Sequence, residues 1–361
     1  MPHQRQHRKS GDRSSDRVLA VKPTKVRIDA SSFCQLRCPG CPVHSRTAAS
    51  AVGKCFLKLS DLEKVLDENP HIRMIELSNY GEMFLNPELV EIMKLARGRG
   101  VILTADNGVN LNHAKTGVLE ELVRERFRSL TCSIDGASHE TYRIYRAGGD
   151  FATVIENIRK INVFKGKYVS DYPHLTWQMI LFGHNEHEIP AAKRLAGQLG
   201  MRFKLKLPWD SRFSPVRDRQ SVIKEIGAIT REEYKEKHRR SYTWGLCHQL
   251  WHHPQINADG EVLGCSCNFW GDFGGNAFRD GLSASLNSEK MAYARQMLLG
   301  RKPPRQDIPC ATCSMYAEMT SSGRFLRERP ALPYRVVFGI QSLIWKHSFP
   351  PHFRRRPRST S

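Results

Sequence analysis

Three cysteines lie close together near the start of the chain, in a spacing that suits a metal cluster. Cys34, Cys38 and Cys41 form a C-x3-C-x2-C pattern directly after an expected strand at 25–30. A cubane iron–sulfur cluster has four irons, and a four-cysteine site holds all of them. Three thiolates leave one iron without a protein ligand, and an open position is where a metal does chemistry. A three-cysteine zinc site completed by His44 is the alternative.

A second group of cysteines lies in the last third of the chain. It consists of Cys247, Cys265 and the C-x2-C pair Cys310 and Cys313. The segment 256–265 predicts a hairpin with a turn at Asp259-Gly260, which would deliver Cys265 to the site. Four thiolates would make a closed site, either a cluster or a zinc ribbon. Cys267 is an alternative ligand to Cys265, whereas Cys55 and Cys132 are expected to be ordinary core residues.

Alternating strand and helix patterns surround these cysteines. We expect strands near 25–30, 74–77, 101–104, 130–134, 175–182 and 202–207, with helices at 60–68, 86–99, 114–126, 150–164 and 186–199. Such a series predicts an α/β fold with parallel strands and outer helices. Six units are too few for a closed eight-unit barrel, so we predict a partial (β/α)6 barrel with a small C-terminal cluster-binding α+β extension. The cysteine loop falls at the carboxyl ends of the strands, where ligands bind in such folds.

The C-x3-C-x2-C loop resembles the signature of the radical S-adenosylmethionine (radical SAM) enzymes. In that family the open iron binds the amino and carboxylate groups of S-adenosylmethionine (SAM). An electron from the cluster cleaves SAM into methionine and a 5′-deoxyadenosyl radical. The family core is a six-unit partial barrel. One difference is Gly40, which stands where the family usually has an aromatic residue beside the adenine.

Further segments at the ends of the expected strands also resemble this family. The resemblance implies SAM contacts from Gly81, Glu82, Ser133, Asp135, Arg146 and Asn185. Glu82 would bind the amino group, and an acidic side chain suits an ammonium. Arg146 would pair with the carboxylate of SAM, because a planar guanidinium can donate two parallel hydrogen bonds to a carboxylate. The alternative is that Arg146 forms only a surface ion pair. The segment 104–108, Thr-Ala-Asp-Asn-Gly, is either an Asn-Gly turn or substrate-facing.

The second cysteine group, with four residues between Gly260 and Cys265, resembles the twitch domain, a shortened form of the SPASM domain. No cysteine follows Cys313, so the resemblance implies one auxiliary [4Fe–4S] cluster with four protein ligands, suited to electron transfer. We therefore divide the chain into five segments. They are a basic N-terminal tail (1–24), a radical SAM core (25–207), a linker with one helix at 230–239 (208–246), a SPASM/twitch-like domain (247–320) and a basic C-terminal tail (321–361).

The net charge of +20 is concentrated at the two ends of the chain. Residues 1–28 carry eight Lys and Arg against two Asp, and residues 324–361 carry nine against one Glu. A nucleic-acid-binding fold would show a basic face in its core, so nucleic acid is not expected as a partner. We expect solvated, partly disordered tails, or a peripheral membrane contact through 336–345 and Arg354–Arg356.

No apolar run is long enough to span a membrane, and no signal peptide is recognisable, which indicates a cytoplasmic protein.

These features predict a radical SAM oxidoreductase that abstracts hydrogen from an unactivated C–H bond. Electron transfer through the auxiliary cluster would make the reaction a net oxidation, and an electron donor such as flavodoxin or ferredoxin is implied. A small natural-product or sugar-like substrate is preferred, with a ribosomal peptide side chain as the alternative. The rival class is a non-catalytic zinc or cluster protein that binds nucleic acid or membrane through its tails.

Overall fold

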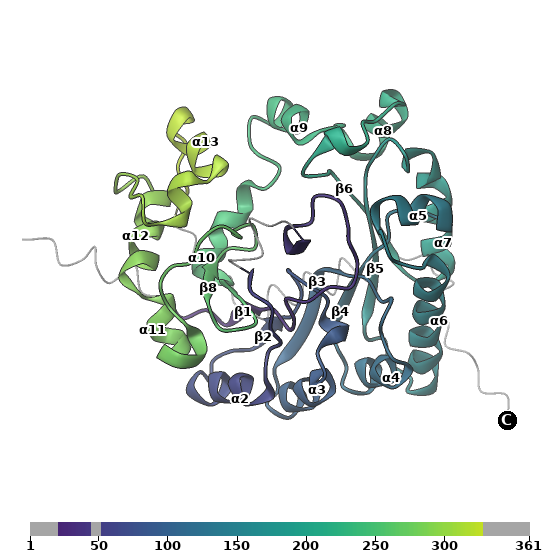
Figure 1. The fold of residues 1–361 in the computed structure, drawn as a ribbon, viewed down its shortest axis with the longest axis horizontal. Coiled ribbons are helices and arrows are strands. Elements are labelled where there is room, and N and C mark those ends of the chain that lie inside the picture. Colours follow the sequence, from purple (N-terminus) through teal and green to yellow (C-terminus); the bar gives the residue numbers. More distant parts are fainter. Residues whose placement is uncertain (1–20, 45–51, 328–361) are drawn as a thin grey trace, which may run out of the picture.

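The computed structural model describes residues 21–44 and 52–327 and contains a single eight-stranded sheet (Figure 1). The strands are β1 (Lys25–Ile28), β2 (Met74–Glu76), β3 (Ile102–Val109), β4 (Ser129–Ser133), β5 (His174–Ile180), β6 (Arg202–Lys206), β7 (Gln255–Ile256) and β8 (Val262–Gly264). Their order is β6-β5-β4-β3-β2-β1-β7-β8, and only the β7–β8 pair is antiparallel. The prediction of six parallel strands in sequence order is confirmed.

Helices cover the outer side of this sheet, as the alternating pattern predicted (Figure 1). Those of the barrel are α2 (Leu59–Glu68), α3 (Leu89–Gly98), α4 (Thr116–Arg124), α5 (His139–Tyr145), α6 (Phe151–Lys167) and α7 (Ile189–Gln198). The sequence explains their starts: Ser138 caps α5 by accepting the Thr141 N–H, and Asp150 caps α6 by accepting the Thr153 N–H. Such caps satisfy backbone donors that the first helical turn leaves free.

The two faces of the sheet differ because successive side chains of a strand point to opposite sides. The face under the helices is apolar and fully buried, with Leu130, Cys132, Leu175, Trp177 and Met179 on β4 and β5. The inner face is polar. Across β4, β5 and β6 it carries two registered rows, Thr131–Thr176–Arg202 and Ser133–Gln178–Lys204. A polar inner face at an open sheet is suited to ligands rather than to a packed core.

The C-terminal hairpin extends the barrel sheet directly. β7 pairs in parallel with β1, and the Arg27 Nε donates to Gln255 Oε1 at 2.9 Å across the pair. Gln255 is fully buried, so this contact belongs to the core. The predicted hairpin and its turn at Asp259-Gly260 are present, with Gly260 at a φ of +92°. The hairpin therefore attaches Cys265 to the sheet next to β1, the strand that leads into the cysteine loop.

The remaining helices belong to the C-terminal third and to the segment that precedes it. They are α8 (Arg219–Ile226), α9 (Arg231–His238), α10 (Gln249–His252), α11 (Leu282–Leu286), α12 (Glu289–Leu298) and α13 (Ser314–Ser322). The segment 208–246, which we expected to be irregular apart from one helix, thus holds two. At the described ends of the chain, Val21 exchanges hydrogen bonds with the Asn287 side chain, and Leu326 is buried.

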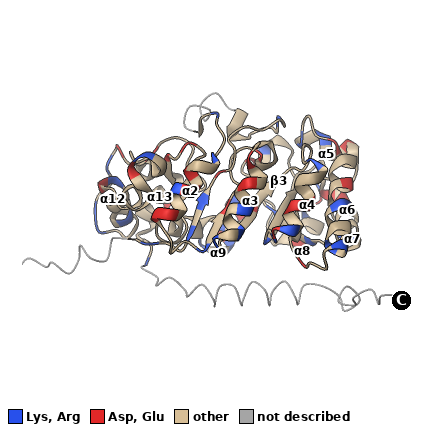
Figure 2. Ribbon diagram, turned by 90° about the horizontal axis from the view of Figure 1, so that it is seen from below, with Lys and Arg blue, Asp and Glu red and all other residues tan. Residues whose placement is uncertain are grey.

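Acidic and basic residues are intermixed on the helices visible in Figure 2. Within the described residues, no helix is both long and apolar enough to cross a membrane. The proposed membrane-contact segment 336–345 lies outside the described residues.

Candidate active site

The cysteine loop follows β1 and is fixed to the barrel by backbone hydrogen bonds. The Arg37 N–H donates to Ala147 O at 2.9 Å, which ties the loop to the end of α5. Within the loop, the Cys41 N–H donates to Cys38 O at 3.1 Å, so these two cysteines stand on one tight turn. Cys38 is buried and His44 is exposed. The loop thus gathers its thiols at the carboxyl ends of the strands, as predicted.

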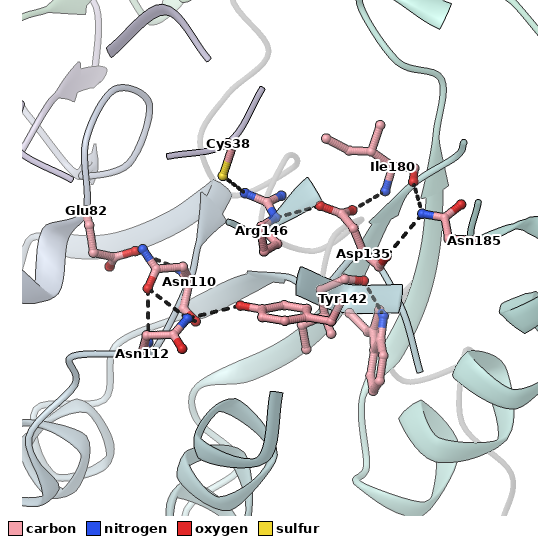
Figure 3. A network of polar contacts seen from close by, with 11 residues as sticks. Cys38, Glu82, Asn110, Asn112, Asp135, Tyr142, Arg146, Ile180 and Asn185 are labelled. Carbon is pink, nitrogen blue, oxygen red and sulfur yellow. Dashed lines mark hydrogen bonds and ion pairs between the residues drawn. The ribbon is translucent and has the colours of Figure 1, made fainter. Parts of the chain in front are cut away.

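Arg146 lies between an aspartate and a cysteine of this loop (Figure 3). Its Nε donates to Asp135 Oδ2 at 2.6 Å, and its Nη1 lies 3.7 Å from Cys38 Sγ. The second oxygen of Asp135 accepts the Ile180 N–H at 2.5 Å, which fixes the carboxylate at the end of β4. The Asp135 side chain is fully buried and that of Arg146 is 13% exposed. The ion pair is therefore a buried one, not the surface pair considered as the alternative.

Gly81 and Glu82 pack directly against the start of the cysteine loop. Gly81 has a φ of +77°, and a Cβ there would collide with the carbonyl oxygens of Ser31 and Phe33. The Glu82 N–H donates to Phe33 O at 2.7 Å, and the Glu82 side chain is buried. The turn therefore needs a glycine before the glutamate because the loop crosses it closely.

Asn110 is a site residue that the sequence analysis missed. Its N–H donates to Glu82 Oε2 at 2.6 Å (Figure 3), and its Nδ2 lies 3.8 Å from Cys34 Sγ. Gln35 also donates to Asn110 Oδ1 at 2.7 Å. Asn110 was missed because β3 extends to Val109, with an irregularity between Ala105 and Val109, whereas the Asn-Gly dipeptide predicted a turn. Of the two alternatives for 104–108, the Asn-Gly turn is therefore not present, and the longer strand carries Asn110 to the cysteine loop.

Burial dominates the electrostatics of the thiols and carboxylates in this region. It raises the pKa of Cys34 to about 12, with the Glu82 charge adding to the shift, and it raises the pKa of Cys41. It also raises the pKa of Glu82 to about 7. Burial alone would lower the pKa of Arg146, but Asp135 and Cys38 raise it further than burial lowers it. Arg146 is therefore a permanent cation at the cysteine loop, in which the buried Cys34 and Cys41 thiols keep their protons until a metal displaces them.

The other predicted SAM residues occupy the ends of β4 and β5. Ser133 is buried on the inner face of the sheet, where a Cβ on Gly108 would collide with its Oγ. Asn185 is fully buried, and its Nδ2 donates to Asp135 O at 3.1 Å and to Ile180 O at 2.9 Å. Asn185 therefore holds together the two backbone segments that fix the Asp135 carboxylate.

An aromatic group stands beside Arg146 at the same end of the sheet. Tyr145 and Phe182 have ring centroids 4.6 Å apart, and Phe213 lies 5.6 Å from Tyr145 and 5.4 Å from Phe182. His184 stacks on Phe182 at 5.4 Å. These rings come from different elements, so their gathering was not evident from the sequence. They offer apolar surface near the cysteine loop.

The second cysteine group is also brought together, beside the β7–β8 hairpin. Burial raises the pKa of Cys247 well above its usual range, and the neighbouring thiols raise it further: Cys265, Cys310, Cys313 and Cys267. Burial, Cys265 and Cys313 likewise raise the pKa of Cys310. Such mutual effects require the thiols to be neighbours. Both Cys265 and Cys267 belong to this group, so the choice between them as ligands stays open.

The donor atoms of both groups are thiols, the ligands that zinc and iron–sulfur clusters share. Within residues 21–44 and 52–327, no three or more His, Cys, Asp or Glu side chains are placed to hold one metal ion. A zinc ion needs all its sulfur ligands at about 2.3 Å, whereas the thiolates of a cubane each bind a different iron. Soft thiolates alone, gathered in buried surroundings, are the ligands such clusters use.

Comparisons with known proteins identify the fold. No family model matches the sequence, and no curated protein matches it. Among solved structures, SuiB from Streptococcus suis bound to S-adenosylmethionine aligns with a TM-score of 0.58 at 12% identity, over 81% of this chain and 71% of that one. SuiB bound to precursor peptide SuiA aligns with a TM-score of 0.59 at 12% identity, over 84% and 72%.

A third structure, anSMEcpe with bound AdoMet, aligns with a TM-score of 0.56 at 16% identity, over 90% of this chain and 99% of that one. These likenesses extend over most of each chain, so they include the C-terminal third as well as the barrel. At such identities they define architecture rather than activity. The chain has the partial-barrel α/β fold of the radical SAM enzymes.

Proposed function

We propose that this protein is a radical SAM enzyme whose catalytic cluster is held by Cys34, Cys38 and Cys41. The observation that carries the proposal is the position of Arg146, a buried cation 3.7 Å from the Cys38 sulfur and held in place by Asp135. A cluster with three protein ligands has one open iron, and the cofactor would need a fixed cation for its carboxylate at that place. The shared fold supports this proposal independently.

The residues around the loop have distinct tasks in this proposal. Glu82 would accept the amino group of SAM, and an ammonium beside this carboxyl would favour its ionised form. Arg146 would bind the carboxylate, while Ser133 would face the ribose. Asp135 and Asn185 hold the arginine and the strand ends in position. A bound [4Fe–4S] cluster would supply the electron that cleaves SAM to methionine and a 5′-deoxyadenosyl radical.

The second cysteine group extends the proposal to a net oxidation. We assign Cys247, Cys265, Cys310 and Cys313 to an auxiliary [4Fe–4S] cluster of the SPASM/twitch type. Four thiolates leave such a cluster no open iron for the substrate, so its chemistry would be electron transfer. The hairpin β7–β8 supports this role because it attaches Cys265 to the barrel sheet through β1. An electron left on the substrate would thus have an acceptor within the same fold.

The substrate has two candidate classes. A small natural-product or sugar-like molecule is the one that the sequence favoured. A peptide is the second, supported by the likeness to SuiB, which has been solved with a precursor peptide bound. Incubating the reconstituted enzyme with each class and following substrate mass would separate them, because oxidation removes two hydrogens from whichever one reacts.

Metal analysis tests the proposal as a whole. Anaerobic reconstitution should give about eight irons per chain, four for each cubane, and a brown chromophore. Stoichiometric zinc with no chromophore would instead favour the rival class, a non-catalytic protein acting through its basic ends. Substituting Cys38 by Ala should lower the iron content to about four, because only the auxiliary set remains complete.

A further inference from the structure

Three cations approach one another at the end of β6, on the polar inner face of the sheet. Lys204 and Lys206 alternate with the outward-facing Phe203 and Leu205, so both lysines point inward. Arg231, the first residue of α9, donates from Nε to Pro208 O at 2.8 Å and from Nη2 to Leu207 O at 3.1 Å. These bonds fix the guanidinium against the residues that directly follow Lys206.

The Arg231 side chain is held rigidly and leaves one donor unused. Its guanidinium carbon lies 3.5 Å from the ring centroid of Trp209 and 5.0 Å from that of Tyr242. Its Nη1 is buried and has no hydrogen-bond partner among the described residues. A buried donor without an acceptor is costly, and native proteins rarely leave one. The acceptor is therefore expected from a molecule that the protein binds.

Lys206 lacks a carboxylate partner in the same way. Its half-buried ammonium makes no hydrogen bond or ion pair with any residue in the described ranges. Burial lowers its pKa to about 8, and the neighbouring cations Lys204, Arg231 and Arg146 lower it further, whereas the thiol of Cys267 opposes them. Lys206 thus lies within electrostatic reach of both the arginine proposed to bind SAM and Cys267 of the second cysteine group. Asp106 raises the pKa of Lys204 and Glu232 that of Arg231, but burial outweighs both effects. Positive charges gathered without an ion pair are the signature of an anion site.

We propose that Lys206 and Arg231, flanked by Lys204, form a subsite that binds an oxyanionic group of the substrate, a carboxylate or a phosphate. The inference rests on the proposed function, because it places this group in the lumen of a radical SAM barrel. The planar guanidinium of Arg231 can donate hydrogen bonds to the anion, and the ammonium of Lys206 adds a compact positive charge. This combination suits a carboxylate or a phosphate. Bound there, the anion would hold the substrate between the two cysteine groups.

A binding experiment with inorganic phosphate and with acetate tests the subsite. The reconstituted, SAM-loaded protein is titrated with each anion by calorimetry at constant ionic strength. Lys206→Met removes the charge at nearly constant volume, and Lys206→Arg restores it. We expect the wild type to bind at least one of the two anions, Lys206→Met to bind it about tenfold more weakly, and Lys206→Arg to recover most of the affinity. Binding of phosphate alone would indicate a phosphorylated substrate, and binding of both would indicate a less selective oxyanion site.

The matched control is Lys94→Met, which removes an exposed lysine from the outer helix α3 and should leave anion binding unchanged. Failure of the wild type to bind either anion would overturn the inference. A second result would also overturn it: Lys206→Met binds the anions as tightly as the wild type but shifts the reduction potential of the auxiliary cluster. The lysine would then only offset the charge of that cluster. These failures differ from failure of the proposed function, which would appear as absence of iron and of SAM cleavage in the wild type.

Discussion

The Nε of Arg146 lies 2.6 Å from Oδ2 of Asp135, and neither side chain has more than 13% of its surface exposed. The pair joins the end of β4 to the end of α5, directly beside Cys38. Because it is withdrawn from solvent, salt screens it little. Its geometry therefore fixes a cation at the cysteine loop before any ligand arrives.

Removing the aspartate should destabilise the protein strongly. Asp135→Ala leaves Arg146 as a buried, uncompensated charge, and breaking such a pair costs about 3 kcal/mol or more in free energy of unfolding. Urea denaturation followed by circular dichroism measures it. The control is Asp210→Ala, which breaks the exposed pair with Arg212 and should leave the midpoint in place. Equal effects of the two substitutions would contradict the buried role of the Asp135 pair.

A side chain at Gly81 should disrupt the cysteine loop. Gly81→Ala places a Cβ against the carbonyl oxygens of Ser31 and Phe33 at a positive φ, and we expect a loss of about 2 kcal/mol or more together with reduced iron at the loop. Iron analysis after reconstitution and a thermal melt provide the readouts. Gly197→Ala, on α7 with open space around it, should be neutral or slightly stabilising. Full iron loading of Gly81→Ala would show that the turn tolerates displacement.

Acid should destabilise the fold through His174, at the start of β5. Burial lowers its pKa from 6.5 to about 4, with Lys165 and Arg128 adding to the shift. The unfolded chain therefore binds this proton more readily, so the contribution is complete above pH 6.5 and is lost as the pH falls from 6.5 to 4. The difference between the pKa of His174 in the unfolded chain and in the folded protein corresponds to at most about 3 kcal/mol of the free energy of unfolding.

Unfolding free energies of His174→Gln measured between pH 4 and pH 7 check this. The variant should lose less stability on acidification than the wild type does. The exposed His113→Gln is the control and should follow the wild-type curve. Parallel curves for His174→Gln and the wild type would mean that other groups cause the acid sensitivity.

The auxiliary cysteines should be separable from the catalytic loop. Cys310→Ala should lower the iron content from about eight to about four per chain, keep SAM cleavage, and stop substrate oxidation. Comparing Cys265→Ala with Cys267→Ala identifies the fourth ligand, because only loss of the true ligand should remove the auxiliary iron. Cys132→Ala, a core substitution under the helices, is the control for iron content. Retained substrate turnover in Cys310→Ala would refute the electron-transfer role.

The sequence predicted the barrel because the pattern of each element is local. Strands and amphipathic helices are visible over a few residues, and the cysteine spacing lies within one loop. The same holds for the hairpin that carries Cys265. What sequence reasoning missed depends on contacts between distant segments. The pairing of β7 with β1 joins residues 228 positions apart through Arg27 and Gln255, and no local pattern indicates it.

Asn110 and Arg231 show the same limit at the site. Asn110 was hidden because an Asn-Gly dipeptide usually marks a turn, whereas the strand here continues through an irregularity. Arg231 lay in a segment interpreted as a linker, and only the fold places it beside Lys206. Residues whose function depends on long-range packing have no sequence signature of their own.

The central claim is that Cys34, Cys38 and Cys41 form a catalytic centre for SAM. The most direct test is formation of 5′-deoxyadenosine by the anaerobically reconstituted protein with SAM and dithionite, measured by chromatography. The account predicts 5′-deoxyadenosine from the wild type, none above background from Cys38→Ala, and continued formation by Cys310→Ala. Absence of 5′-deoxyadenosine from fully iron-loaded wild type, or equal amounts from Cys38→Ala, would contradict it.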